Sequence, residues 1–401
     1  MSVRAEPVAA RSRLLERAAT TVLERALVDL EGGTLEVELP DGGVRRFGSG
    51  APVRLTIHDR ALYRRLATRG KLGLGESYTA GEWNADDLVA LFELLLRNAE
   101  TAATRHATLR RLLELRPRLH RRNGFLRSRR NIAYHYDLGN ELFALMLDET
   151  MTYSCAVFER PELSLADAQR AKFDRLCRSL SLGPDDRVLE IGCGWGGFAR
   201  HAAERYGCRV TGLTISHEQA VLARERTRGL PVEIREQDYR AVEGSYTKVV
   251  SIEMIEAIGA DQFGTFFATI DRVLAPGGRA AVQTILVPEQ RWDRYRRTPD
   301  WIERYIFPGC LIPSLEALVT AAARSSRLGV YGVEEIGVHY AETLRRWRAS
   351  IHERLDEVRA LGYDRRFERT WDFYLAFCEA GFRRRALRDA QLLLARPGES
   401  G

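Results

Sequence analysis

Paired cysteines, long apolar runs and lysine are all scarce in this sequence. Six cysteines occur in 401 residues and none forms a C-x-x-C pair, so neither a disulfide framework nor a zinc site is indicated. No apolar run approaches the length of a membrane-spanning helix, and the amino-terminus lacks the apolar segment of a secretory signal peptide. These shortages predict a cytoplasmic protein without a metal site.

Arginine, in contrast, is abundant, and much of it lies in one segment. The chain carries a net charge of +6, and residues 105–130 hold ten arginines against one acidic residue, Glu114. That segment contributes +9, which leaves the remainder of the chain at about −3. Such a basic linker suits a polyanionic surface, either a membrane or a nucleic acid, and a solvated linker face is the alternative.

Residues 1–104 predict a small α+β domain that precedes the basic linker. A helix is expected over residues 1–30, and alternating apolar residues predict short strands over 34–39, 44–47 and 53–57. Asp59 is a candidate cap for a helix that runs to Ala67, and the glycine-punctuated stretch 71–83 is expected to be a loop. Asn84 is a candidate cap for a helix whose apolar face is formed by Leu88, Leu91, Phe92 and Leu95.

Residues 131–401 predict a second, larger domain in which strands and helices alternate. Two helices, over 132–147 and 163–180, come first, and the strands that follow are expected over 188–191, 209–213, 232–235, 249–252 and 280–286. The helices between them are expected over 198–206, 217–226 and 263–274, a rhythm that predicts a doubly wound, mostly parallel α/β sheet. Ligands of such sheets bind at the carboxyl ends of the strands, near Glu190, Thr214, Asp238, Glu256 and Gln283.

An aromatic and basic segment, 288–313, interrupts this rhythm as an insertion. It is expected either to cover a site or touch a membrane, or to form a packed helical pair. A strand over 330–336, helices over 341–361 and 367–380, and a last strand over 387–394 complete the expected second domain.

The stretch 188–199 (VLEIGCGWGGFA) reads as a short strand, a glycine-rich turn and the start of a helix. Gly192, Gly194 and Gly197 match the loose dinucleotide fingerprint G-x-G-x-x-G. Glu190 favours a different ligand, because a carboxylate at the strand end can hold the cationic methionine end of S-adenosylmethionine. The motif therefore favours a methyltransferase, with a dinucleotide site and a tight turn without a ligand as alternatives.

Four long motifs in the second domain carry a resemblance to a known family. They are HYDLGNELF (135–143), MTYSCAVF (151–158), VLEIGCGWGGFA with VTGLTIS..Q (188–219), and IEMIEAIG (252–259). Together with YIFPGCLIPS (305–314) and HYAETLRRW (339–347), they resemble the cyclopropane-fatty-acyl-phospholipid synthase family. The resemblance covers residues 131–396 and extends to KLGLGESYTAGEW in the first domain.

This resemblance implies a Rossmann-like methyltransferase sheet with a smaller α+β amino-terminal domain. It also implies an enzyme that uses S-adenosylmethionine to methylate cis double bonds in phospholipid acyl chains. The expected partner is thus a phospholipid membrane surface, at the inner face of the cell membrane, and not a nucleic acid. A homodimer is a further expectation.

By position, two sets of site residues follow from the resemblance. The cofactor set joins Glu190 and the loop glycines to residues from other segments: Tyr153, Ser154, Gly192, Gly194, Gly196, Thr214, Gln219, Asp238 and Tyr239. A second set falls where the family coordinates a bicarbonate ion: Cys155, Glu256, Gln283, Ile285 and Tyr340. Thr214 and Gln219 stand where most methyltransferases have a ribose-binding acid, which further disfavours a dinucleotide.

Methylation of an alkene requires a dry site, aromatic faces and a base. Water would trap the carbocation, and the rings of Tyr153, Phe158, Trp195 and Tyr340 are candidates to stabilise it. The base is expected to be the buried bicarbonate ion, which Glu256 orients, and Glu256 itself is the alternative base. Cys155 can also be read as a small core residue without covalent chemistry.

The chain departs from the family pattern at two positions. Many members have Glu-His where this chain has Glu256-Ala257, and a histidine where it has Gln283. Alkene methylation is still expected, but the product stays open between a cyclopropane ring and a methylene branch. Two rival functions are methylation of a soluble small molecule and lipid binding without catalysis.

Overall fold

The computed structural model describes residues 27–105, 139–298 and 300–398, which fall into two compact units. The smaller unit contains the described residues up to 105, residues 298, 300 and 301, and residues 362–384. The larger unit contains the other described residues. Most of the basic linker, the greater part of the helix expected over 1–30 and the start of that over 132–147 lie outside the described residues.

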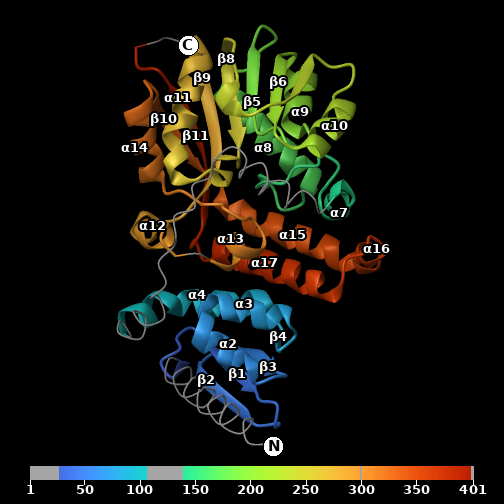
Figure 1. Cartoon of the computed structure of the whole chain (residues 1–401), viewed down its shortest axis with the longest axis vertical. Helices are drawn as coiled ribbons and strands as arrows, with labels where there is room; N and C mark the ends of the chain where they lie inside the picture. Colours follow the sequence, from blue (N-terminus) through green and yellow to red (C-terminus); the bar gives the residue numbers. More distant parts are fainter. Residues whose placement is uncertain (1–26, 106–138, 299, 399–401) are drawn as a thin grey trace, which may run out of the picture. The chain divides into compact units, whose positions relative to one another are not determined.

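The smaller unit is built on a four-stranded sheet with the order β2-β1-β3-β4 (Figure 1). Its strands are β1 (Gly33–Glu38), β2 (Val44–Ser49), β3 (Pro52–Ile57) and β4 (Trp83–Ala85). Its helices are α2 (Ala61–Arg69), α3 (Lys71–Thr79), α4 (Leu88–Arg105) and α17 (Arg365–Arg383). Side chains of β1 alternate between buried and half-buried, as expected of a strand with one face on a core.

Helix α17 belongs to this smaller unit, although the sequence analysis assigned residues 362–384 to the second domain. The Phe92 ring of α4 packs edge-on against the Phe373 ring of α17, with centroids 4.9 Å apart. Arg369 donates to the backbone oxygens of Tyr78 at 2.5 Å and of Trp83 at 2.7 Å. An amphipathic helix that lies far away in the sequence thus completes the core of the amino-terminal unit.

The loop expected over residues 71–83 is wrong, because residues 71–79 form α3. Glycine disfavours a helix by about 1 kcal/mol relative to alanine, but tight packing overrides that preference here. A Cβ added at Gly73 would lie 2.2 Å from the carbonyl oxygen of Arg65, and one at Gly75 would lie 2.4 Å from the Trp301 ring. Only glycine allows these close approaches.

The expected cap at Asn84 is also wrong, because Asn84 lies in β4. The carboxylate of Asp87 instead accepts from the amide of Ala90 at 2.9 Å, at the start of α4. Asp59 accepts from the amide of Ala61 at 2.8 Å, at the start of α2. Short polar side chains therefore satisfy the first amides of both helices.

The larger unit is built on a seven-stranded sheet with the order β10-β11-β9-β8-β5-β6-β7. Its strands are β5 (Arg187–Ile191), β6 (Arg209–Thr214), β7 (Val232–Glu236), β8 (Tyr246–Ile252), β9 (Leu274–Leu286), β10 (Gly329–Glu335) and β11 (Arg388–Ala395). Strands β9, β8, β5, β6 and β7 run parallel, whereas β11 pairs antiparallel with both β9 and β10. The predicted doubly wound, mostly parallel sheet is confirmed.

Helices cover both faces of this sheet (Figure 1). The larger unit includes the helices α7 (Gly139–Met146), α8 (Leu165–Ser179), α9 (Gly197–Tyr206), α10 (His217–Arg226), α11 (Phe263–Val273), α14 (Leu315–Ser325), α15 (Tyr340–Glu353) and α16 (Leu355–Ala360). On one face, Phe173 of α8 and Phe198 of α9 pack with Val188 of β5. On the other, α11 and α14 cover a larger apolar cluster.

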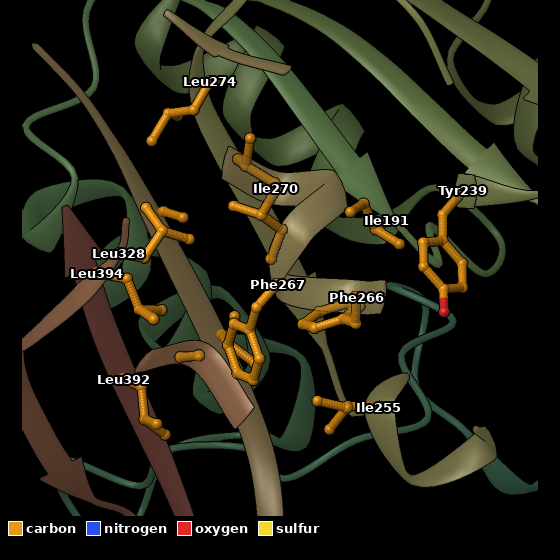
Figure 2. Close-up of a cluster of buried hydrophobic side chains, with 14 of the residues drawn as sticks. Ile191, Tyr239, Ile255, Phe266, Phe267, Ile270, Leu274, Leu328, Leu392 and Leu394 are labelled. Atoms are coloured by element: carbon orange, nitrogen blue, oxygen red, sulfur yellow. The ribbon is translucent and has the colours of Figure 1, made fainter. Parts of the chain in front are cut away.

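That larger cluster joins strands from both halves of the sheet. Figure 2 shows Phe266 and Phe267 of α11 between Leu392 of β11 and Ile191 of β5. Because apolar burial contributes about 25 cal/mol per Å², these rings fix α11 against the strands whose carboxyl ends carry the predicted site.

The segment 288–313 links β9 to α14 through two short helices, α12 (Glu289–Tyr295) and α13 (Trp301–Tyr305). At its end, the amide of Leu311 donates to the backbone oxygen of Glu256 at 2.8 Å. Within the described ranges, no helix is both long enough and apolar enough to cross a membrane.

Candidate active site

The glycine-rich turn after β5 has the geometry of a ligand cradle. Gly192, Gly194 and Gly196 have φ values of +85°, +52° and +81°, in the left-handed region that favours glycine. A Cβ at Gly194 would meet nothing within 4 Å, so one side of the turn is open. Helix α9 begins at Gly197, and its first amides face the same turn.

Glu190 is the buried carboxyl group beside this turn. It is 2% exposed, and its Oε2 atom has no hydrogen-bond partner among the described residues. Burial raises the pKa of Glu190 to about 8, while Lys172 and the Ala199 amide act in the opposite direction. A buried acid with an unmade bond fits a cationic ligand, so these residues fit the ammonium group of S-adenosylmethionine.

The next two strands end in further residues of the predicted cofactor set. Thr214, the last residue of β6, donates through its hydroxyl to Gln219 Oε1 at 2.8 Å. Beyond β7, the carboxylate of Asp238 is bound by Arg240, with the closest contact at 2.6 Å. The structure thus brings Thr214 and Gln219 together, and it ties Asp238 to an arginine that the sequence analysis did not consider.

Tyr239 belongs partly to the core. Its ring packs at 5.8 Å from Phe266, and its hydroxyl has no partner among the described residues. Burial raises the pKa of Tyr239 to about 12, so the hydroxyl is protonated and is available as a donor to a ligand.

Tyr153 and Ser154 precede α8, and Tyr153 packs among aromatic rings whereas Ser154 contacts a buried cation. The Tyr153 ring lies 5.1 Å from Trp347 and 5.3 Å from Phe143. The Ser154 hydroxyl accepts from the Lys172 ammonium at 2.6 Å. Lys172 is fully buried, and burial lowers its pKa to about 8, against the opposing charge of Glu253. The sequence analysis did not identify this buried cation.

Glu253 occupies the centre of the second predicted set. It directly follows β8, and its backbone has a φ of +49°, which is uncommon for a residue other than glycine. Its Oε1 atom accepts from the Cys155 amide and from Gln283 Nε2, both at 2.8 Å. Its Oε2 atom accepts from the Tyr340 hydroxyl at 2.6 Å.

Glu256 lies one turn further along the chain in a separate pocket of donors. Its Oε1 atom accepts from the Ile285 amide at 2.5 Å and from the Thr284 hydroxyl at 2.9 Å. Burial, and next the charge of Glu253, raise the pKa of Glu256 to about 8. At neutral pH Glu256 is therefore mostly protonated, and a protonated carboxyl cannot act as a base.

Residues of β11 complete the surroundings of Glu253. Gln391 donates to Gln283 Oε1 at 3.0 Å, which turns the Gln283 amide nitrogen toward Glu253. Asp389 is fully buried, and burial followed by the charge of Glu253 raises its pKa well above the usual range. Burial, and next the charges of Asp389 and Glu253, raise the pKa of the Cys155 thiol, so the thiol stays protonated.

The five residues predicted to hold bicarbonate therefore lie together, but their donors are already engaged. Cys155, Gln283 and Tyr340 donate to Glu253, and the Ile285 amide donates to Glu256. An added bicarbonate ion would have to displace one of these carboxyl groups. The residues present do not fit this ion.

The aromatic residues named from the sequence are divided between two environments. Tyr153, Tyr340 and Trp347 form one group, in which the rings of Tyr340 and Trp347 lie 6.1 Å apart. The Phe158 ring is instead covered by the Arg346 guanidinium at 4.5 Å. Trp347 was missed because helical spacing alone does not distinguish a core tryptophan from one in a site.

Glu253 is the most important residue that sequence reasoning missed. The motif IEMIEAIG contains both Glu253 and Glu256, and only Glu256 was assigned. One signal could have identified Glu253: it directly follows a buried parallel strand, a position where such sheets place ligand-binding residues. Asp389 and Gln391 gave no comparable signal.

The fold and this site define a methyltransferase that depends on S-adenosylmethionine. The chain matches the family described as mycolic acid cyclopropane synthetase over residues 125–392. It is 40% identical to the tuberculostearic acid methyltransferase UfaA1 of Mycobacterium tuberculosis, over 96% of this chain and 91% of that protein. It is 36% identical to the cyclopropane-fatty-acyl-phospholipid synthase of Escherichia coli, over 90% of this chain and 93% of that one.

Solved structures agree with these sequence matches. The cyclopropane synthase MmaA2 of Mycobacterium tuberculosis superposes with a TM-score of 0.62 and 30% identity, covering 67% of this chain and 98% of MmaA2. The mycolic acid cyclopropane synthase CmaA1, complexed with SAH and CTAB, gives a TM-score of 0.61 with 29% identity, over 66% of this chain and 97% of CmaA1. The chain belongs to the mycolic acid cyclopropane synthetase family.

Proposed function

We propose that this enzyme transfers a methyl group from S-adenosylmethionine to the cis double bond of an unsaturated phospholipid acyl chain. The observation that carries the proposal is the placement of a half-buried carboxylate, Glu253, near aromatic residues in a protein of this family. The Tyr340 hydroxyl that donates to Glu253 belongs to the same side chain whose ring packs with Trp347. A carbocation on an acyl chain needs these two features together, because rings stabilise the cation and a base removes a proton.

The first part of the site would hold the cofactor. Glu190 would pair with its ammonium group, while the turn at Gly192, Gly194 and Gly196 would accept the main body of the ligand. Thr214 and Gln219 would present hydroxyl and amide groups to its ribose. S-adenosylmethionine, when bound, supplies an electrophilic methyl group.

The second part of the site would act on the acyl chain. Tyr153, Tyr340 and Trp347 would turn aromatic faces toward the developing positive charge and exclude water from it. Cys155 would act through its backbone amide and not as a nucleophile, since its thiol is buried and protonated. The base would be a carboxylate of the chain and not the bicarbonate ion that the resemblance implies, because Cys155, Gln283 and Tyr340 already donate to Glu253.

Two products remain candidates. Loss of a proton from the new methyl group with ring closure gives a cyclopropane, which is the first candidate. A hydride shift before that loss gives a methylene branch. The branched product is favoured by the 40% identity to a protein named tuberculostearic acid methyltransferase, and ring closure by the 36% identity to a cyclopropane-fatty-acyl-phospholipid synthase.

We further propose that the enzyme acts as a peripheral protein at the inner face of the cell membrane. The basic linker supports this, because each arginine near an anionic surface contributes up to about 1 kcal/mol. A homodimer would present two such linkers to one surface and would strengthen the attachment through multivalency.

The experiment uses the purified full chain with S-adenosylmethionine that carries an isotope-labelled methyl group. Vesicles of phospholipids with cis-unsaturated, trans-unsaturated or saturated acyl chains are offered in parallel. Label should enter only the cis-unsaturated lipid. Glu190→Gln should lose most of this transfer, whereas Glu243→Gln, in an exposed loop of the same unit, should retain it. Transfer to a soluble acceptor but to none of the lipids would contradict the proposal.

A further inference from the structure

Three hydrogen-bond donors from three separate segments converge on the carboxylate of Glu253. The Cys155 amide comes from the segment before α8, Gln283 from β9 and Tyr340 from the start of α15. All three distances lie between 2.6 and 2.8 Å, in the range of hydrogen bonds to a charged acceptor. A carboxylate that receives this many donors has a fixed position and orientation.

The donors are the same ones that the family resemblance assigns to a bicarbonate ion. Bicarbonate and a glutamate side chain share one functional group, a planar carbon that carries two oxygens with a delocalised negative charge. A side-chain carboxylate can therefore use a bicarbonate site without any change in the donors. In this chain the carboxylate of Glu253, which is part of the protein itself, accepts hydrogen bonds from these donors.

The backbone and β11 both hold Glu253 in this place. The left-handed φ of +49° turns the residue sharply out of β8, and the Glu253 amide donates to the backbone oxygen of Gln283 at 2.8 Å. Gln391 donates to the oxygen of Gln283, so that the Gln283 nitrogen must face Glu253. Gln283, which stands where many members of the family have a histidine, thus becomes a positioning residue for Glu253.

The charged and titratable groups near Glu253 suit a single negative charge there. Burial raises the pKa of Asp389 of β11 well above its usual range and raises the pKa of Glu256 to about 8, and the Cys155 thiol is protonated. Lys172 of α8 contributes a buried positive charge that acts on Glu253. Among the residues that the structure describes, Glu335 and Tyr340 also face this cluster.

We propose that the carboxylate of Glu253 is the base of the reaction and takes the place of a bicarbonate ion, an inference that rests on the proposed function. The alkene π pair forms the new carbon–carbon bond to the methyl group, the carbon–sulfur bond breaks toward sulfur, and a cation is left on the chain. Glu253 then takes a proton from the new methyl group. The released C–H pair closes a ring, or forms the methylene double bond after a hydride shift. A weak base suffices for the methylene branch, because after the hydride shift the methyl group is attached to the cationic carbon and its protons are strongly acidic.

Activity in carbonate-depleted buffer is the first test. The wild-type chain should keep its full rate of label transfer to cis-unsaturated vesicles, with no increase on addition of bicarbonate. Glu253→Gln should fall by at least about 100-fold, the lower end of what a general base contributes. Glu253→Gly should be equally slow but should recover with formate or bicarbonate, since glycine accepts the left-handed φ and leaves the three donors free. Glu243→Gln serves as the matched control.

Two outcomes of this test would overturn the proposal. One is a wild-type rate that collapses without bicarbonate and returns with it. The other is a Glu253→Gln variant as fast as the wild type. Thermal melting of each variant shows whether a loss of rate reflects a loss of fold.

Binding of isotope-labelled bicarbonate, followed by nuclear magnetic resonance, is the second test and needs no lipid. Glu253→Gly should bind the ion and the wild-type chain should not. Binding by the wild type would overturn the replacement of bicarbonate by Glu253. If the wild type methylates no lipid but this binding pattern is observed, the proposed function fails while the placement of Glu253 in the bicarbonate position stands.

Discussion

Replacement of Glu190 by glutamine should change how the affinity for S-adenosylmethionine depends on pH. In the protein without a ligand, burial raises the pKa of Glu190 to about 8, so about nine-tenths of the molecules carry a neutral Glu190 at pH 7. A cationic ligand favours the ionised form. Binding should therefore release a proton, and the affinity should rise with pH up to about 8, because the free protein binds more protons than the complex.

The magnitude follows from the same pKa. An ionised carboxylate that bonds to an ammonium group contributes about 1.5–3 kcal/mol, or about 10- to 100-fold in affinity. At pH 6 nearly every wild-type molecule carries a neutral Glu190, which resembles an amide. The ratio of wild-type to Glu190→Gln affinity should thus be near one at pH 6 and about 5–50 at pH 8, where half of the Glu190 side chains are ionised.

Isothermal titration calorimetry of both proteins, from pH 6 to pH 8, measures this ratio directly. The titration of the ligand's own amino group affects both proteins equally, so its effect cancels in the ratio of wild-type to Glu190→Gln affinity. Repetition in buffers with different ionisation enthalpies gives the number of protons that Glu190 releases, which should be about 0.4–0.8 for the wild type at pH 7. An affinity ratio that stays constant across this range would refute the assignment of Glu190 as the partner of the cation.

Three further predictions concern stability and membrane attachment. Arg369→Met should lower the free energy of unfolding by about 3 kcal/mol, because it removes three charge-assisted hydrogen bonds, to the backbone oxygens of Tyr78 and Trp83 and to the side chain of Asn84. Arg384→Met, at the exposed end of the same helix, should have little effect in urea titrations. Gly73→Ala should lower the free energy of unfolding by about 1–3 kcal/mol, because the new methyl group would overlap the preceding helix. Gly183→Ala, where a methyl group meets open space, should leave stability unchanged. Equal melting temperatures of the two variants would disprove the packing argument. Co-sedimentation with anionic vesicles should weaken as salt is added, and equal binding to neutral vesicles would exclude an electrostatic role for residues 105–130. The same assay should show weaker binding when four arginines of that segment are changed to serine: Arg121, Arg122, Arg129 and Arg130.

The elements that were predictable from the sequence are those whose local signals and tertiary roles agree. The helix expected over 217–226 matches α10 in both bounds, because Ser216 caps it and its first turn carries an acid. The strand expected over 188–191 differs from β5 by one residue. In both places the pattern of apolar residues, the cap and the turn all indicate the same structure.

Prediction failed where a distant part of the chain determines the local structure. Gly73 and Gly75 indicate a loop by propensity, but they lie in a helix because Arg65 and Trp301 pack directly against them. Helix α17 joins the smaller unit although it is far from it in the sequence. Neither contact has a signal within the segment itself.

The missing part of the site depends on strand register. Strand β11 runs antiparallel beside β9, which places Gln391 opposite Gln283 and Asp389 opposite Ile285. A shift of one residue would turn these side chains to the other face of the sheet. The sequence indicated a last strand over 387–394 but carried no information on its partner or register, so neither Gln391 nor Asp389 could be assigned.

The most direct test of the proposed function is mass spectrometry of phospholipid acyl chains from a host that expresses this protein. The host should lack cyclopropane and methyl-branched acyl chains of its own, and a culture that expresses Glu190→Gln serves as the control. We predict that cis-unsaturated chains gain the mass of one CH₂ group, to a greater extent in the wild-type culture than in the Glu190→Gln culture, and gas chromatography of the methyl esters then distinguishes ring from methylene. Unchanged acyl chains in a host that contains the folded wild-type protein would contradict the proposed activity.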